Sequence, residues 1–267
     1  MRSLIDEFRV FFRFFVINAR AEAEQRIAFA IQQIGMVFNN AFFVIAWAVF
    51  IHEFGEINGW GVIELIGLWG YSALAYGLTF SFFGGAAELK RAVNLGALDS
   101  AMLLPRSLYL RVFSLDLKTN TLGDIIFASI ALAAYAYLSE PGVWGLLTLL
   151  AMVPPAVLIM SNILLITSCI AFFLVDSEHI SNSMFYAFLD PSLYPAGGFQ
   201  GVIRIILIFV IPSLVVGGFP VEIAAAPSAW QFALVWGLGV MWTAIGYIVL
   251  HVCVRFYESG NLTGARL

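Results

Sequence analysis

Charged residues are scarce in this chain of 267 residues, where Asp, Glu, Lys and Arg together make up 11%. An ordinary soluble domain carries about a quarter, so these charges are too few to cover a soluble core of this size. Disorder is also excluded, because 61% of the residues are hydrophobic and 25 of them are Phe. With a mean hydropathy of +0.93, the composition indicates an integral membrane protein.

Residues that build metal centres, disulfides and nucleotide sites are also rare. Both cysteines, Cys169 and Cys253, fall inside apolar runs, and the three histidines are far apart in sequence, so we expect no disulfide framework and no metal site. The only two lysines, Lys90 and Lys118, each follow a leucine, whereas a P-loop needs Gly-Lys-Ser/Thr. We therefore expect a non-catalytic chain that holds no cofactor and binds no nucleic acid.

Six apolar stretches are long enough to cross a bilayer, which takes about 20 residues as a helix. We expect a kink at Pro154-Pro155 in the fourth stretch and an interruption at Pro212 in the fifth, which can be a broken or re-entrant helix. The sequence thus predicts an all-α membrane protein with six transmembrane helices over 31–254, and it shows no internal repeat. The predicted spans are 31–51, 60–84, 121–139, 143–175, 199–218 and 228–254.

The positions of the 13 Lys and Arg residues orient this map. They precede the first span, separate the second from the third, or follow the sixth, except for Arg204 at the start of the fifth. By the positive-inside rule, both termini, including the tail 255–267, face the cytoplasm of a multi-pass cell-membrane protein. We expect Arg204 to reach the cytoplasm by snorkelling, the segment 176–198 to be cytoplasmic, and Asp124, near a span end, to reach water.

The N-terminal segment 1–30 is predicted to form an amphipathic helix in the cytoplasmic interface. At 100° per residue, its arginines gather on one side and its aromatic residues on the other. This helix is either a plain membrane anchor or an anchor that also contacts a partner protein. The two faces comprise Arg2, Arg9 and Arg13 against Phe8, Phe11 and Phe15.

The cytoplasmic segment 85–120 alternates charged side chains with leucines. Gly96 is expected to interrupt one short helix and Pro105 to end another. Leucines exposed at this surface need to be covered by lipid, by the chain itself or by a soluble partner.

Polar residues inside the spans are few, and we expect Asn162, Arg204 and Pro212 to serve packing or a translocation path. Gly70, Gly77 and Gly84 recur every seven residues and predict close packing against a neighbouring span or a second copy. A stand-alone secondary transporter would show paired ionisable residues and symmetry between halves, and neither is present. A stand-alone secondary transporter and a structural membrane component remain the alternative functions.

Three motifs in order resemble the ABC-2 family of exporter permeases. The stretch from Gly96 to Arg106 is similar to that family's Gly-x-Leu-Asp…Leu-Leu-x-Pro signature. The segment with Tyr194-Pro195, Arg204, Pro212 and Phe219-Pro220 is similar to a second patch, and 255–260 to a closing Tyr-Glu-Ser-Gly motif. The basic residue of the first motif, Arg106, follows the proline here, where in the family it often precedes it.

The resemblance implies the transmembrane permease subunit of an ATP-driven ABC exporter. Such subunits form homodimers or pair with a related permease, and they bind cytoplasmic ABC ATPase subunits that hold ATP and Mg. By this resemblance, the interfacial helix and the segment 85–120 dock on the ATPase, and the substrate path forms between two permeases in the bilayer. The residues expected to shape the coupling element are Glu88, Arg91, Gly96, Leu98, Asp99, Leu104, Pro105 and Arg106.

Overall fold

The computed structural model describes residues 26–103, 107–115, 121–174 and 177–257. The predicted interfacial helix with Arg2, Phe8, Arg9, Phe11, Arg13 and Phe15 lies outside the described residues, as do Leu104, Pro105, Arg106 and the end of the tail. The described chain is helical almost throughout, and its only β-bridge joins Ile57 to Trp60. This confirms the prediction of an all-α membrane protein.

Five segments in the described chain are long and apolar enough to cross a membrane: Ile27–Phe54, Val62–Phe83, Leu122–Ser139, Gly142–Phe172 and Ala229–Phe256. Helices satisfy every backbone hydrogen bond within the segment, which hydrocarbon surroundings require. The segments correspond to α2 (Arg26–Phe54), α3 (Val62–Phe83), α7 (Leu122–Ser139), α8 (Gly142–Ala151) with α9 (Val153–Ser168) and the short η1 (Cys169–Phe172), and α13 (Ala229–Cys253).

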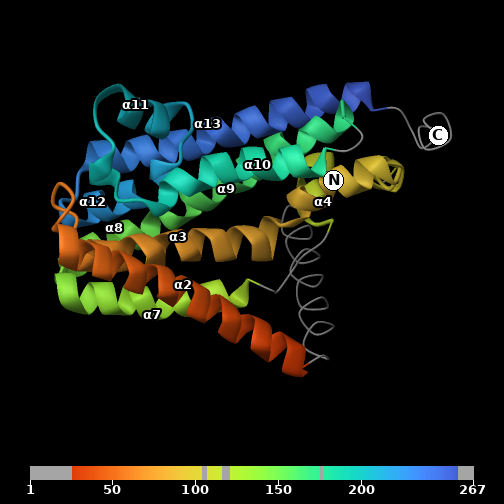
Figure 1. Ribbon diagram of the computed structural model, residues 1–267. Coiled ribbons are helices and arrows are strands. Elements are labelled where there is room, and N and C mark those ends of the chain that lie inside the picture. The colour runs from red at the N-terminus through yellow and green to blue at the C-terminus, as the bar shows by residue number, and fades with distance from the viewer. Residues whose placement is uncertain (1–25, 104–106, 116–120, 175–176, 258–267) are drawn as a thin grey trace.

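The helices form an elongated bundle with two distinct ends (Figure 1). One end, here called the hairpin end, carries the α2–α3 loop, the α7–α8 turn, α11 (Gly201–Phe209) and α12 (Gly218–Ala225). The other, the elbow end, carries α4 (Gly85–Asn94), α5 (Leu98–Met102) and α6 (Leu108–Phe113). Helix α9 is largely buried, with α3 and α13 packed against it.

Small residues bring the long helices close together, as the seven-residue glycine spacing predicts for the first two positions. A Cβ atom on Gly70 would lie 3.0 Å from the Cβ of Ala131, and one on Gly77 would lie 2.7 Å from Ile125. Both contacts join α3 to α7, so this stripe packs against a neighbouring span of the same chain. A Cβ atom on Gly84 would instead overlap the carbonyl oxygen of Phe80, in the last turn of α3.

The predicted interruption in the fourth span is present. Helix α8 ends at Ala151 and α9 begins at Val153, with Pro154 and Pro155 in its first turn. Proline has no N–H to donate, so it is accommodated where a helix starts. The carbonyl oxygen of Met152 accepts a hydrogen bond from the Ala156 amide and a second one, of 2.7 Å, from the Tyr71 hydroxyl, which ties α3 to the break.

The prediction of a fifth span over 199–218 is wrong. This apolar stretch folds as α11, the 3-10 turn η4 (Leu214–Val216) and the start of α12, all at the hairpin end. The chain instead runs from the elbow end to the hairpin end through 177–196, which we had expected to lie in the cytoplasm. Helix α10 (Glu178–Leu189) lies along α9, and η2 (Asp190–Leu193) continues it.

Candidate functional site

The elbow, which we define as α4, α5 and α6, is folded tightly on itself. Helix α4 buries Ala86, Leu89 and Lys90, and α5 buries Leu98. A Cβ atom on Gly85 would lie 2.6 Å from the carbonyl oxygens of Val112 and Phe113, so only glycine allows α4 and α6 to cross at this distance. The elbow is therefore a compact unit and not an extended loop.

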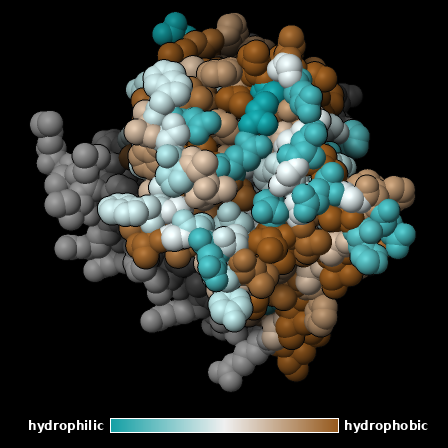
Figure 2. Space-filling model, turned by 90° about the vertical axis from the view of Figure 1, so that its left-hand side faces the viewer, coloured by the Kyte–Doolittle hydropathy of each residue, from teal (hydrophilic) through white to brown (hydrophobic). Residues whose placement is uncertain are grey.

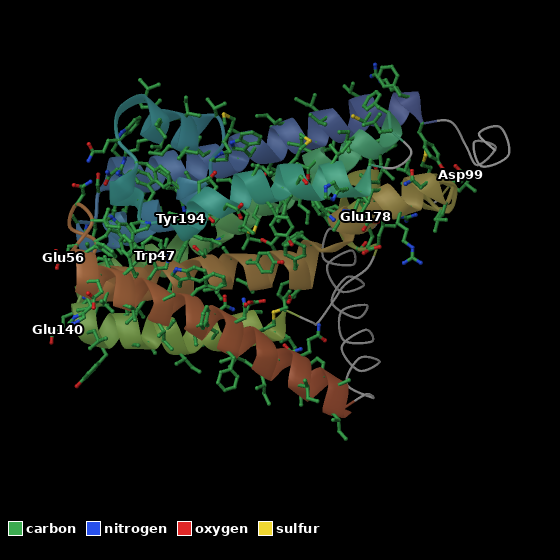
Figure 3. The ribbon with its side chains drawn as sticks, viewed as in Figure 1. Trp47, Glu56, Asp99, Glu140, Glu178 and Tyr194 are labelled. Carbon is green, nitrogen blue, oxygen red and sulfur yellow. The ribbon has the colours of Figure 1, made fainter. Side chains whose placement is uncertain are left out.

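Gly96 makes the turn between α4 and α5. Its φ of +70° lies in the left-handed region, which glycine adopts without strain. Helix α4 ends at Asn94 and α5 begins at Leu98, which confirms the predicted interruption at Gly96. The turn places Asp99 in the first turn of α5, at the opposite end of the bundle from Glu56 and Glu140 (Figure 3).

Asp99 contacts the segment that follows the last span. Its carboxylate lies near the Tyr257 hydroxyl, which is buried and has no hydrogen-bond partner among the described residues. Burial, together with this nearby carboxylate, raises the pKa of Tyr257 from 10.0 to about 12. The ring of Tyr257 also packs edge-on against Phe172 of η1, with centroids 6.0 Å apart. The first and third motifs of the sequence thus meet at one point.

Two hydrogen bonds fasten the elbow to the bundle. The buried ammonium group of Lys90 donates to the Oδ1 atom of Asn182 on α10. The Tyr109 hydroxyl of α6 donates to Oδ1 of Asn162 on α9 at 2.7 Å. Burial raises the pKa of Tyr109, so its hydroxyl stays a donor at neutral pH.

Asn162 is the polar centre of the α6, α9 and α13 junction. Its amide donates to the Leu158 carbonyl at 2.8 Å and lies 3.5 Å from the Thr243 hydroxyl. A Cβ atom on Gly246 would lie only 2.1 Å from its Oδ1 atom, so glycine opens the space that the amide fills. The expected packing role of Asn162 is what its contacts support, because the side chain is fully buried.

Four apolar side chains of the elbow remain uncovered by the described chain. The burial of Leu89 and Leu98 shows that the chain covers part of the predicted leucine surface, but Leu103 is 85% exposed and Leu95 67% exposed. Arg91 is exposed beside them. The four uncovered side chains, which we call the elbow patch, are Leu95, Met102, Leu103 and Leu110.

Arg204 and Pro212 lie at the hairpin end, far from the elbow. The expectation that Arg204 snorkels toward the end that carries the other cations is wrong, because its guanidinium forms an ion pair with Glu222 and donates to the Ala196 carbonyl at 3.3 Å. It also lies 5.8 Å from the centre of the Phe219 ring. The second sequence motif therefore folds into a local cluster that holds α11 against α12.

The surface at the hairpin end is mixed. Figure 2 shows hydrophilic side chains across the middle of this face with hydrophobic ones around them. Glu56, Asn58, Glu140 and Gln200 are exposed here. Within this end, the Trp60 indole lies 3.4 Å from the Glu222 carboxylate, and Asn58 donates to the Gly197 carbonyl at 2.8 Å. The α2–α3 loop is thus fastened to the α10–α11 connection.

Asp124 does not reach water, contrary to expectation. It is 5% exposed, and its Oδ1 atom accepts a hydrogen bond of 2.6 Å from Asn40 on α2. Gln33, two turns earlier on α2, accepts a hydrogen bond from the Gly123 amide. These contacts join α2 to the first turn of α7. In the described part of the chain, no group of three His, Cys, Asp or Glu residues could hold a metal ion.

The structure unites some of the predicted site residues and separates others. Gly96, Leu98 and Asp99 lie together in the elbow, with Glu88 and Arg91 on its α4 helix. Lys90, Tyr109, Asn182 and Tyr257 had no predicted role, although they fasten the elbow. Tyr257 was within a recognised motif, and Lys90 stood out as one of two lysines, whereas nothing in the sequence pairs Tyr109 with Asn162.

The sequence matches one protein-family model, that of the ABC-2 family transporter protein, over residues 37–261. No curated protein and no solved structure matches the sequence. The matched region contains the elbow, the hairpin end and four of the five apolar segments in full. It also contains the part of the first segment, Ile27–Phe54, that follows residue 36. Because the match extends over most of the sequence, the chain belongs to the ABC-2 transporter family and is a multi-pass membrane component of an ABC transporter.

Proposed function

We propose that this chain is the export permease of its transporter and that the elbow transmits the work of a separate ATPase subunit. The observation that carries the proposal is the elbow patch. Exposed leucines on a compact unit that also bears exposed charge are typical of a surface covered by a protein partner. The ATP and Mg would be bound by that partner.

The described cations support the proposed orientation. Lys90, Arg91, Arg111 and Arg255 belong to the elbow end, whereas Arg204 at the hairpin end is paired with Glu222. By the positive-inside rule, this asymmetry supports an elbow in the cytoplasm, where ATP is available. With α10 counted as a crossing, the described chain would pass the bilayer six times, which supports the proposal that both termini face the cytoplasm.

The hydrogen bonds of the elbow supply a route by which movement of the ATPase could reach the membrane helices. When the ATPase closes on ATP, the elbow moves with it. Tyr109 would carry this displacement to Asn162, and so to α9 and α13, while Lys90 would carry it to α10. Side-chain hydrogen bonds between rigid helices are a physical means of biasing two packed arrangements. The substrate path would form between this permease and a second one.

The test is ATP hydrolysis by the complex purified from its own membranes through a tag on this chain. We expect ATPase activity in the wild-type complex and in Leu103→Met, which keeps an apolar side chain. Leu103→Asp should insert normally but lose most of the copurifying ATPase activity. A Leu103→Asp complex with wild-type ATPase activity would contradict the elbow patch as the docking surface. Purified wild-type complexes without any nucleotide-binding subunit would contradict the function itself.

A further inference from the structure

Helix α13 has one continuous exposed face on the outside of the bundle. The helix runs along an edge of the molecule from the hairpin end to the elbow end (Figure 1). Exposed residues recur every three or four positions, as on one side of a helix. The face ends in a cation at the elbow end and is otherwise mostly apolar. Its exposed residues include Gly237, Val240, Ala244, Tyr247, Ile248 and Arg255.

The cationic end of this face lies at the level of the lipid headgroups. The span Ala229–Phe256 has 28 residues, so at about 1.5 Å per residue it is about 42 Å long. A bilayer is about 40–45 Å thick with its headgroups, around a hydrocarbon core of about 30 Å. Arg255, the last residue but one of the span, therefore lies among phosphates, while Val240 and Ala244 lie among acyl chains. This holds for either orientation of the chain.

His251 lies one helical turn before Arg255, on the same side of α13. Its Nδ1 atom is 2.7 Å from the Tyr247 carbonyl oxygen, and because a carbonyl oxygen only accepts, the proton is on Nδ1. The Nε2 atom is thereby left for a ligand. A phosphate beside it would favour the imidazolium form, in which Nε2 also donates.

Aromatic rings hold this imidazole in place. The Tyr247 ring lies against the His251 ring, with centroids 4.1 Å apart. Tyr109 of the elbow in turn packs edge-on against Tyr247, with centroids 5.5 Å apart. The polar end of the exposed face is therefore in contact with the elbow.

We propose that Arg255 and His251 bind the phosphate of an anionic phospholipid whose acyl chains lie along the exposed face of α13. Arginine suits this ligand, because its planar guanidinium donates two parallel hydrogen bonds to a phosphate group. Gly237 and Ala244 project little from the middle of the face, and no atom lies within 4 Å of a Cβ added to Gly237. An acyl chain can therefore approach the helix closely there.

Charge favours an anionic lipid over the other occupants of this face. A zwitterionic lipid such as phosphatidylcholine would bring its own cation close to Arg255, whereas phosphatidylglycerol would not. A second copy of the chain, packed on α13 by two-fold symmetry with the helices parallel, would bring the two Arg255 side chains toward each other. Like charges at that position would oppose the contact.

Electron paramagnetic resonance of spin-labelled lipids tests the proposal. The full chain is reconstituted in phosphatidylcholine vesicles at physiological salt with a trace of phosphatidylglycerol or phosphatidylcholine, each labelled on an acyl chain. The fraction of the label that the protein immobilises gives the relative affinity. We expect the wild type to hold phosphatidylglycerol about fivefold more tightly, as one arginine near the membrane surface predicts. No ATPase is involved, so the result is independent of the proposed function.

Substitutions locate the preference. Arg255→Gln should abolish most of it and His251→Gln part of it, whereas Arg255→Lys keeps the charge and should retain most of it. Arg91→Gln is the matched control, because it removes an exposed cation from the elbow, and it should leave the preference unchanged. Equal immobilisation of the two lipids by the wild type would overturn the proposal. Equal losses in Arg255→Gln and Arg91→Gln would also overturn it, because the attraction would then belong to the whole charged end and not to a site.

Discussion

Asp99 of the elbow lies close to Tyr257 in the segment after the last span, and the carboxylate of the first helps to raise the pKa of the second. Eight α-helices of the described chain, α6 to α13, separate these residues, yet each residue lies within one of the motifs that resemble the ABC-2 family. The contact closes the elbow end of the bundle.

The Tyr257 contact has a pH signature. The pKa of this hydroxyl is raised from 10.0 to about 12, so the folded state favours the protonated phenol. Its stabilising contribution is complete below the unfolded pKa of about 10 and is lost as the pH rises through about 12. The difference in phenolate absorbance between the wild type and Tyr257→Phe should therefore titrate near pH 12.

Asp99→Asn separates the two causes of this shift. Burial is the larger cause, so the pKa of Tyr257 in Asp99→Asn should fall only in part and stay above its ordinary value. A return to the ordinary value would show that the carboxylate, and not burial, dominates.

The Asn162 junction should be the polar contact of the elbow with the largest effect on stability. Asn162→Ala leaves the partly buried Tyr109 hydroxyl without its acceptor and should lower the free energy of unfolding by about 1–3 kcal/mol. Tyr109→Phe removes the same hydrogen bond but leaves Asn162 its contacts with Leu158 and Thr243, so it should cost less. Thermal unfolding of both single variants and the double variant measures the coupling energy, and strictly additive effects would contradict a shared hydrogen bond.

Gly85 should not tolerate a methyl group. The Cβ atom of Gly85→Ala would lie 2.6 Å from two carbonyl oxygens of α6, so α4 and α6 must separate. We expect a loss of about 1–3 kcal/mol of stability. Gly35→Ala is the matched control, because it is also helical and no atom lies within 4 Å of the added Cβ. Equal unfolding temperatures for the two variants would show that the elbow does not cross this closely.

The Arg204–Glu222 pair should hold the hairpin end together with modest energy. Its side chains are 30% and 28% exposed, so solvent screens the attraction, and Arg204→Met should cost about 1 kcal/mol. Restoring the pair in reverse, with Arg204→Glu and Glu222→Arg, should recover part of the loss in a thermal-unfolding assay. If the double variant is less stable than either single one, the contacts of Arg204 with Ala196 and Phe219 are the main contribution.

Apolar length was a reliable guide to the five long helices, because a helix that crosses lipid must be both long and apolar. The same criterion failed for 199–218, where α11 ends at Phe209 and Pro212 and Gly217 separate it from α12. It also missed α10, because Ser181, Asn182 and Ser183 make its first turns polar. Asn182 is tolerated there because Lys90 from the elbow binds it, and a partner so distant in sequence leaves no local pattern.

The candidate site was predictable only in its outline. Gly96 was identifiable because glycine interrupts a helix, and Asp99 because it lies in the first motif. The exposure of leucines was predictable because they alternate with charged residues in the segment 85–120. Pairings such as Tyr109 with Asn162 and Arg204 with Glu222 depend on how helices are rotated against each other. Weak periodicity in a nearly uniform apolar sequence does not specify that rotation.

Cysteine accessibility tests the central claim, that the elbow faces the cytoplasm as the docking surface for an ATPase. In a Cys169→Ser/Cys253→Ser chain, Ala97→Cys reports on the elbow and Gly198→Cys on the hairpin end, both at exposed positions. A membrane-impermeant maleimide should label Ala97→Cys only in inside-out vesicles, and Gly198→Cys only in right-side-out vesicles. Labelling of Ala97→Cys from the outside would contradict the account, because no ATPase could then reach the elbow.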